Sequence, residues 1–352
     1  MDNRITKRRL SDFLSYEWIL MIVIVVAAII VWEFAYTVGA VRLTTGQHFK
    51  FYYDETISSS DNDKMYDLFN KYDTFSYDVL KLDSEALTSE YNVMSVRLSV
   101  QEGDILITDK KQAMKDDGNG GQEIDESKSV RAKSHIDNFS MYALDDTLSD
   151  AQKYLAQFLN DGLDIFDFEG KYDLNKIVNY IYDFNNYSDA KIRSYFLRRM
   201  EDDNRFRSDE QKADGFKLEK DRIKDLTEEV KLFDEFIKYA NANPELGLLF
   251  NYRKYEQSYK LTTDQENKAR YETMMNNQQV KPYAINVEAF TGVCAGTTEP
   301  STFLRMKGAD SAKDVVIMAF NFYSYQPHLQ FETISFMNTI IRECFDTSLL
   351  GI

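Results

Sequence analysis

An uninterrupted apolar segment near the start of the chain constrains its fold more than any other feature. Residues Trp18 to Trp32 (WILMIVIVVAAIIVW) contain no charged side chain, and after Glu33 the apolar character continues to Val41. A helix of about 24 residues is about 36 Å long at about 1.5 Å per residue, enough to cross a hydrocarbon layer of ~30 Å. The pattern therefore predicts a transmembrane helix over residues 18–41.

The residues that flank this segment predict its orientation. Residues 4–9 hold basic side chains and no acidic one, and basic residues beside a span favour the cytoplasmic side. Trp18 and Trp32 lie where aromatic rings prefer the membrane interface. We expect a single-pass protein of the cell membrane, with residues 1–17 as a cytoplasmic basic tail and the bulk of the chain extracellular.

A cleaved signal peptide is the alternative that the sequence leaves open. Val38, Gly39 and Ala40 would form a small-residue cleavage site behind a basic region. The apolar segment is longer than the about 7–15 residues usual in a signal peptide, and mixed residues including Glu33 separate it from that site. We therefore favour an uncleaved anchor.

The rest of the chain is polar and acidic. The sequence has 58 Asp and Glu residues against 42 Lys and Arg residues, giving a net charge of −16. Nucleic-acid binding requires a basic surface, so the composition argues against that class of partner. With 43% hydrophobic residues the chain can build a core. Its richness in Tyr, Asn, Lys and Asp is typical of a low-GC Gram-positive bacterium.

Cysteine and histidine are too few for a disulfide framework or an evident metal site. Cys294 and Cys344 could pair outside the cell, but a cysteine at an apolar helix position is more often part of the core. The three histidines, His48, His135 and His328, are isolated and lack the spacing of metal ligands. We expect no metal and no cofactor.

Hydrophobic periodicity indicates an α/β fold. The first half alternates between strands, predicted over residues 47–53, 75–82 and 104–109, and helices with apolar faces at residues 65–72 and 91–98. Strand–helix–strand repeats of this kind are typical of a parallel sheet covered by helices. A polar break follows at residues 110–133, where the spacing of acidic residues does not fit a calcium loop and a mobile surface excursion is expected.

The second half is predicted to be helical and then to return to the core. Residues 145–240 read as several helices, and residues 201–235 contain 13 acidic and 8 basic side chains. Within them a narrow apolar stripe predicts a docked helical hairpin, with a coiled-coil surface as the alternative. Residues 314–323 (DVVIMAFNFY) form the strongest predicted strand, and an amphipathic helix follows it.

Three segments resemble the type II extracellular solute-binding proteins of bacterial ABC importers, in a degenerate, membrane-anchored form. They are Phe49–Glu55 (FKFYYDE), Val93–Asp109 with its Gly-Asp turn, and Lys281–Ile285 (KPYAI). The charged residues 195–240 depart from the usual second lobe, and a transmembrane helix replaces the lipid attachment motif.

The resemblance implies an N-terminal transmembrane helix followed by a two-lobed periplasmic-binding-protein-like domain with a helical insertion. Residues 44–145 would form the first α/β lobe, shared with the C-terminus. Residues 146–280 would form a helix-rich second lobe or insertion, and residues 281–352 would supply the return strand and C-terminal helix.

No motif in the sequence predicts an enzyme. The chain has no nucleophile elbow, no His-Glu-x-x-His zinc motif, no Cys-x-x-Cys pair and no phosphate loop, so we assign no catalytic residue. A binding protein would instead contact its ligand through loops at the carboxyl ends of strands. These positions hold Tyr53 and Asp54, then Thr108 and Asp109, then Asn321, Tyr323 and Tyr325.

Aromatic faces beside carboxylates and amides suit a sugar or a peptide as the ligand. The sequence therefore favours a membrane-anchored protein that binds a small ligand for the membrane subunits of an ABC importer. The alternative is a non-catalytic extracellular accessory or interaction subunit of a membrane complex that has lost ligand binding.

Overall fold

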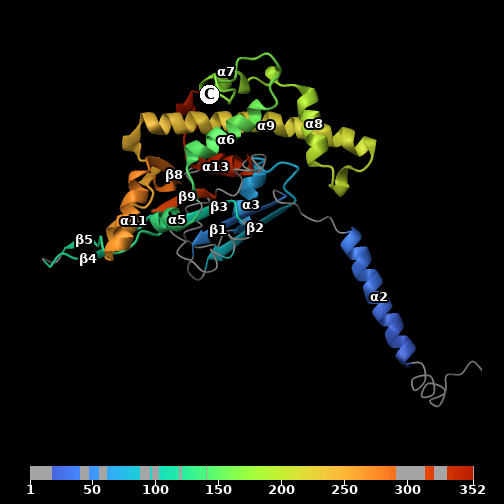
Figure 1. Cartoon of the computed structure of the whole chain (residues 1–352), viewed down its shortest axis with the longest axis horizontal. Helices are drawn as coiled ribbons and strands as arrows, with labels where there is room; N and C mark the ends of the chain where they lie inside the picture. Colours follow the sequence, from blue (N-terminus) through green and yellow to red (C-terminus); the bar gives the residue numbers. More distant parts are fainter. Residues whose placement is uncertain are drawn as a thin grey trace, which may run out of the picture. The chain divides into compact units, whose positions relative to one another are not determined.

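The structure is a computed structural model of the whole chain (Figure 1). It describes residues 18–39, 47–54, 62–87, 96, 103–118, 121–139, 141–290, 314–320 and 331–351. The chain divides into two compact units, Met1–Leu43 and Thr44–Ile352.

The first unit contains the helix α2 (Trp18–Gly39), which is 22 residues long and includes a single charged residue, Glu33. The large apolar side chains between Trp18 and Phe34 whose burial is described are 41–72% exposed. Among the residues that the structure describes, no helix is identified as a candidate membrane span.

The second unit is built on a mixed seven-stranded sheet in the order β2-β1-β3-β9-β8-β7, with β6 paired to β9 outside this path. β1 pairs in parallel with β2 and β3, whereas β3, β9, β8 and β7 pair in antiparallel fashion. The strands are β1 (His48–Asp54), β2 (Lys81–Leu87), β3 (Ile105–Asp109), β6 (Met141–Tyr142), β7 (Leu249–Arg253), β8 (Val280–Asn286) and β9 (Val315–Phe320). An exposed hairpin is formed by β4 (Met114–Asp116) and β5 (Gln122–Ile124).

The helices of this unit vary widely in length. They are α3 (Asn62–Lys71), α5 (Arg131–Asn138), α6 (Leu144–Ala156), α7 (Leu174–Ile181), α8 (Asp189–Arg199), α9 (Asp209–Ala242), α10 (Glu256–Leu261), α11 (Gln265–Asn276) and α13 (Phe331–Cys344). The longest, α9, starts with a capping box in which the Ser208 hydroxyl accepts from the Gln211 backbone N–H and the Gln211 side chain accepts from the Ser208 N–H. This reciprocal pair satisfies two N–H groups that a helix start otherwise leaves open.

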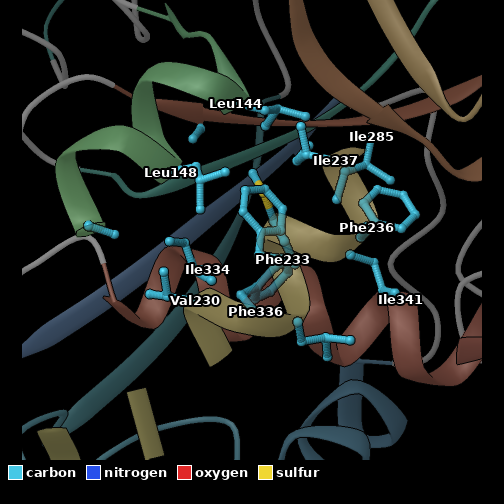
Figure 2. Close-up of a cluster of buried hydrophobic side chains, with 14 of the residues drawn as sticks. Leu144, Leu148, Val230, Phe233, Phe236, Ile237, Ile285, Ile334, Phe336 and Ile341 are labelled. Atoms are coloured by element: carbon cyan, nitrogen blue, oxygen red, sulfur yellow. The ribbon is translucent and has the colours of Figure 1, made fainter. Parts of the chain in front are cut away.

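Alternating side chains of the central strands enter two buried layers. The larger layer joins Phe51, Ile105 and Ile317 of the sheet to α3, α6, α9 and α13. Figure 2 shows its centre, where the helices converge through Leu144, Leu148, Val230, Phe233, Phe236, Ile237, Ile334, Phe336 and Ile341. The smaller layer, on the other face, packs Tyr52, Leu106 and Met318 against α5. The central strands are therefore covered on both faces.

Most of the predicted elements are confirmed. The strands expected near residues 47–53 and 104–109 are β1 and β3, and the predicted helices after β1 and at the C-terminus are α3 and α13. The strand expected over residues 314–323 is present as β9, all of whose residues are buried, although residues 321–323 lie outside the described residues. The helix expected at residues 91–98 also lies almost wholly outside them.

One predicted strand is wrong. Residues 75–80 form turns, and β2 begins only at Lys81. Phe75 and Val79 do pack against the core, which explains the misleading apolar pattern. Ser76 and Asp78 between them bind charged side chains of the surrounding helices instead of joining a strand ladder.

The predicted docked hairpin at residues 195–240 is correct only in part, because α8 does pack against α9 but α9 is not attached by a narrow stripe alone. Residues 209–242 form one continuous helix, and its buried residues from Ile223 to Ala240 belong to the main core. The surface break at residues 110–133 includes the β4–β5 hairpin.

The segments that were expected to form separate lobes contribute to one sheet. Strands from residues 44–145 and 281–352 pair with each other through β3 and β9. Residues 146–280 are mainly helical but add β7 to the same sheet, and residues 44–352 group into one compact unit.

Candidate functional site

Polar side chains collect at the carboxyl ends of two neighbouring parallel strands. Tyr53 is paired with Ile107 in the register of β1 and β3, so Asp54 and Thr108 follow at adjacent positions. Gly103 precedes β3 and has a φ of +117°, which glycine adopts without strain. A Cβ added at this position would collide with the Tyr52 ring, so a larger residue would not fit. The topology thus brings three predicted site residues, Asp54, Thr108 and Asp109, together at one edge of the sheet.

Asp54 is the centre of this cluster. Its carboxylate is 4% exposed and accepts a hydrogen bond from the Thr108 hydroxyl. Two side chains of α5 approach it, with Arg131 Nη1 3.6 Å from Oδ1 and His135 Nε2 3.4 Å from Oδ2. A buried carboxylate requires such compensation, because an isolated charge would be costly away from water.

Asp109 and Arg131 form the more accessible part of the cluster. Arg131 Nε lies 3.8 Å from Asp109 Oδ2, and Asp109 Oδ1 accepts from the Lys111 backbone N–H at 3.1 Å. The Arg131 side chain is 37% exposed, and both of its ion pairs are longer than a hydrogen bond. Its guanidinium can therefore bind a further acceptor, while Asp109 can accept from a hydroxyl or an ammonium group.

The other predicted site residues are placed differently. Tyr53 is buried and belongs to the main core on the side of α6, α9 and α13. Asn321, Tyr323 and Tyr325 lie outside the described residues. Arg131 and His135 were missed by sequence reasoning, and the available signal was their spacing of four residues, which places them on one face of a helix.

A pocket of about 260 Å³ adjoins the first turn of α5. It opens between this helix, the β4–β5 hairpin and α10. Its lining is mixed, and the residues are Gln112, Ala113, Ile124, Asp125, Glu126, Lys128, Val130, Lys133, Tyr252, Glu256, Gln257, Lys260 and Leu261. None of the five cluster residues, Asp54, Thr108, Asp109, Arg131 and His135, lines this pocket.

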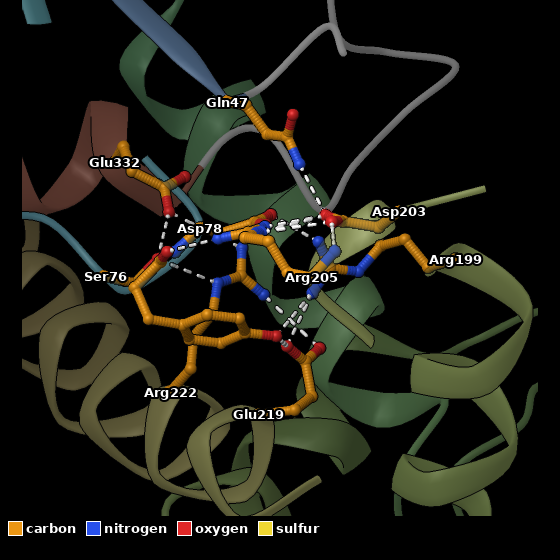
Figure 3. Close-up of polar contacts among 10 residues, drawn as sticks. Gln47, Ser76, Asp78, Arg199, Asp203, Arg205, Glu219, Arg222 and Glu332 are labelled. Carbon is orange, nitrogen blue, oxygen red and sulfur yellow. Dashed lines mark hydrogen bonds and ion pairs between the residues drawn. The ribbon is translucent and has the colours of Figure 1, made fainter. Parts of the chain in front are cut away.

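A second charged cluster, which the sequence did not reveal, lies among α8, α9 and α13 (Figure 3). Arg199 pairs with Asp78 and, at 2.5 Å, with Glu219. Arg222 lies 3.6 Å from Glu332, whose carboxylate accepts from the Ser76 hydroxyl at 2.9 Å. These contacts hold the turn before β2 against three helices.

The same network continues to the start of β1. Arg205 bridges Asp78 at 3.2 Å and Asp203 at 2.8 Å, and Gln47 donates to Asp203 at 2.9 Å. The network contains three arginines, Arg199, Arg205 and Arg222, against four carboxylates, Asp78, Asp203, Glu219 and Glu332. With every group ionised, the network carries one excess negative charge.

Burial and pairing shift the pKa values in this network in opposite directions. Burial raises the pKa of Glu332 above its usual value, although Arg222 opposes the shift. Burial would also raise the pKa of Asp203, but hydrogen bonds from Arg205 outweigh it and lower that pKa. The network therefore has one carboxyl group that resists ionisation and one that favours it.

Neither cluster resembles a metal centre. Within the described ranges, no group of three or more His, Cys, Asp or Glu side chains is arranged to hold a metal ion. Comparisons of the chain with protein-family models, curated proteins and solved structures gave no match. The geometry of these two clusters is therefore the ground on which a function can be assigned.

Proposed function

We propose that this protein is a membrane-anchored extracellular binding protein whose ligand site is the cluster at the carboxyl ends of β1 and β3. The observation that supports this best is the meeting of Asp54, Thr108 and Asp109 with Arg131 and His135 of α5. Ligand sites in open α/β sheets commonly lie outside the carboxyl ends of parallel strands. The solute would be passed to the membrane subunits of an ABC importer.

The chemistry of the cluster suits a small ligand with both donors and acceptors. Arg131 offers planar N–H donors, and Asp109 offers a carboxylate beside them. A peptide satisfies both with its carboxylate and amine, and a sugar does so with its hydroxyls. These are the two ligand classes that the experiment should compare.

The anchor in this proposal is α2. Its support is the run of apolar side chains from Trp18 to Trp32 and the exposure of those side chains along the helix. The basic residues at positions 4–9 favour a cytoplasmic N-terminus.

The test is thermal unfolding of the full chain in detergent against sugar and peptide libraries. A ligand at 100 times its dissociation constant stabilises the protein by about 2.7 kcal/mol. Arg131→Gln should abolish the ligand-dependent shift, whereas Arg270→Gln on the exposed face of α11 should retain it. A shift that survives Arg131→Gln would place the ligand elsewhere.

The second candidate function is that of an accessory subunit of a membrane complex, and the turn that carries Phe168 favours it. The Phe168 ring is 96% exposed on a turn in which the Asp167 carboxylate accepts from the Glu169 and Lys171 backbone N–H groups, each at 2.8 Å. A large apolar ring held out on an ordered turn is suited to anchor a protein partner. This candidate predicts that membrane subunits copurify with the wild-type protein and are lost from the Phe168→Ala variant. It also predicts that no ligand in the libraries shifts the unfolding temperature.

A further inference from the structure

A second pocket, separate from the strand-end cluster, lies between the turn before β2 and the helices α9 and α13. Its volume is about 180 Å³. It is lined by Asp73, Thr74, Phe75, Ser76, Tyr77, Leu218, Asp221, Arg222, Asp225, Leu226, Glu229, Glu332 and Ser335. The volume is below the about 300–1,000 Å³ of sites for drug-sized ligands, so it suits a group of side-chain size.

The charge of this pocket is strongly negative. Five of the lining residues are acidic and Arg222 is the only basic one. Glu229 is paired with Arg342 at 2.8 Å, and Arg222 is directed to Glu219 and Glu332 of the buried network. Asp73, Asp221 and Asp225 form no ion pair within the described part of the chain.

The crowding of these carboxylates affects the pKa of Asp225. Burial raises its pKa, and the neighbouring charges of Glu228, Asp221 and Asp73 raise it further. Carboxylates that repel one another in this way are stabilised by a cation placed between them.

The interior of the pocket offers a hydrogen-bond acceptor and aromatic surface. Ser335 lines it, is 8% exposed, and its hydroxyl has no hydrogen-bond partner in the described structure. Its oxygen can therefore accept a hydrogen bond from a donor that enters the pocket. Phe75 and Tyr77 also line the pocket, and aromatic faces attract cations.

We propose that this pocket binds an organic cation, a guanidinium or primary ammonium group, between Asp73, Asp221 and Asp225 with a hydrogen bond to Ser335. A planar guanidinium fits best, because it can contact an aromatic face and donate to carboxylates at its edge. The group can belong to a free amine or to an arginine side chain of a partner protein.

The primary test is calorimetric titration of the full chain in detergent with butylguanidinium and with butylurea, which has a similar shape and no charge. Butylguanidinium should bind at least tenfold more tightly than butylurea. Asp221→Asn with Asp225→Asn should weaken its binding at least tenfold. Glu210→Gln with Asp202→Asn, which removes the same charge from exposed positions outside the pocket, should change it by less than twofold.

A second variant, Ser335→Ala, completes the test, and circular dichroism measures whether each variant is folded and at what temperature it unfolds. Ser335→Ala should weaken butylguanidinium binding while leaving the unfolding temperature near that of the wild type. Equal binding of butylurea, or unchanged binding by the Asp221 and Asp225 double variant with an intact fold, would overturn the proposal. If the double variant unfolds, loss of binding in folded Ser335→Ala supports the proposal, and unchanged binding in it overturns the proposal.

A comparison with short peptides decides whether the cation is a free small molecule or an arginine side chain of a partner protein. A terminally blocked Ala-Arg-Ala peptide that binds more tightly than butylguanidinium, while Ala-Ala-Ala does not bind, would assign the pocket to a partner's arginine. Tighter binding of butylguanidinium would assign it to a free small cation.

Discussion

At the scale of single residues, Asp54 shows how a position can be predicted while its environment cannot. The end of an apolar strand is visible in the sequence, so Asp54, Thr108 and Asp109 can be identified without knowledge of their neighbours. Arg131 and His135 reach the same point only because α5 packs across the sheet. Their contribution depends on tertiary packing, which local periodicity does not encode.

Replacing Asp54 by alanine should destabilise the second unit. The change leaves the buried Thr108 hydroxyl without its acceptor and removes the charge that Arg131 and His135 face. A hydrogen bond to a charged group contributes about 1.5–3 kcal/mol, so we expect a loss of that order. Urea unfolding measures it, with exposed Glu201→Gln as a control that should stay within about 0.5 kcal/mol. A loss no larger than in the control would mean that the cluster is not formed.

At the scale of elements, α9 shows where the sequence interpretation underestimates burial. The stripe of Ile223, Leu226, Val230, Phe233 and Ile237 is apolar, as predicted. However, the whole stripe, together with Phe236, lies in the main core, and Glu219 and Arg222 are buried through ion pairs. Charged residues indicate an exposed face unless partners compensate them, and those partners come from distant parts of the chain.

Val230→Asp should therefore unfold the whole second unit and not only peel away a helix. Val230 is fully buried in the main core, and a carboxylate there would have no compensating charge. We expect a loss of several kcal/mol and hydrogen exchange that is faster throughout the sheet. Glu228→Lys on the exposed side of the same helix should change stability by no more than about 0.5 kcal/mol. Faster exchange confined to α9 would instead restore the docked-hairpin interpretation.

The buried ion network predicts two opposite pH dependences. The pKa of Asp203 is lower in the folded protein, so its stabilising contribution is present above the unfolded value near 3.8 and is lost as pH falls through the folded value. Asp203→Asn should remove part of the acid sensitivity. The pKa of Glu332 is raised above 4.5, so its contribution is complete below that pH and is lost as pH rises.

Urea unfolding between pH 3 and pH 7 compares the two variants with the wild type. The free energy of unfolding of Glu332→Gln, relative to the wild type, should increase as pH rises. That of Asp203→Asn should decrease over the same range. Parallel curves for all three proteins would show that these carboxyl groups titrate alike in the folded and unfolded states.

At the scale of the whole molecule, the parallel neighbours β1 and β3 were predictable, whereas the start of β2 and the antiparallel half of the sheet were not. Strand–helix–strand spacing before residue 110 gives β1 beside β3, because such connections are short and locally encoded. The pairing of β9 with β3 joins residues about 200 positions apart, and nothing local specifies it. Pairing of β8 with β7 then draws residues 146–280 into the same sheet, so a helix-rich segment that resembles a separate lobe belongs to one compact unit.

The last prediction follows from the proposed membrane topology and concerns the side of the membrane on which Asn3 and Asp117 lie. In a chain with Cys294 and Cys344 replaced by alanine, a cysteine at Asp117 on the exposed hairpin should react with a membrane-impermeant maleimide added to intact cells. A cysteine at Asn3 should not react, because the basic residues that come after it favour the cytoplasmic side.

Carbonate extraction separates the anchor from its alternatives. Alkaline carbonate releases peripheral proteins, whereas a helix held by about 24 apolar residues should stay in the membrane. An N-terminal epitope should remain on the full-length protein. Loss of that epitope with release of the remainder would show cleavage after Ala40, and labelling at Asn3 alone would reverse the orientation. Either result would contradict the proposal of an anchored extracellular binding protein. After cleavage the strand-end cluster would be free of the membrane, and in the reversed orientation it would face the cytoplasm.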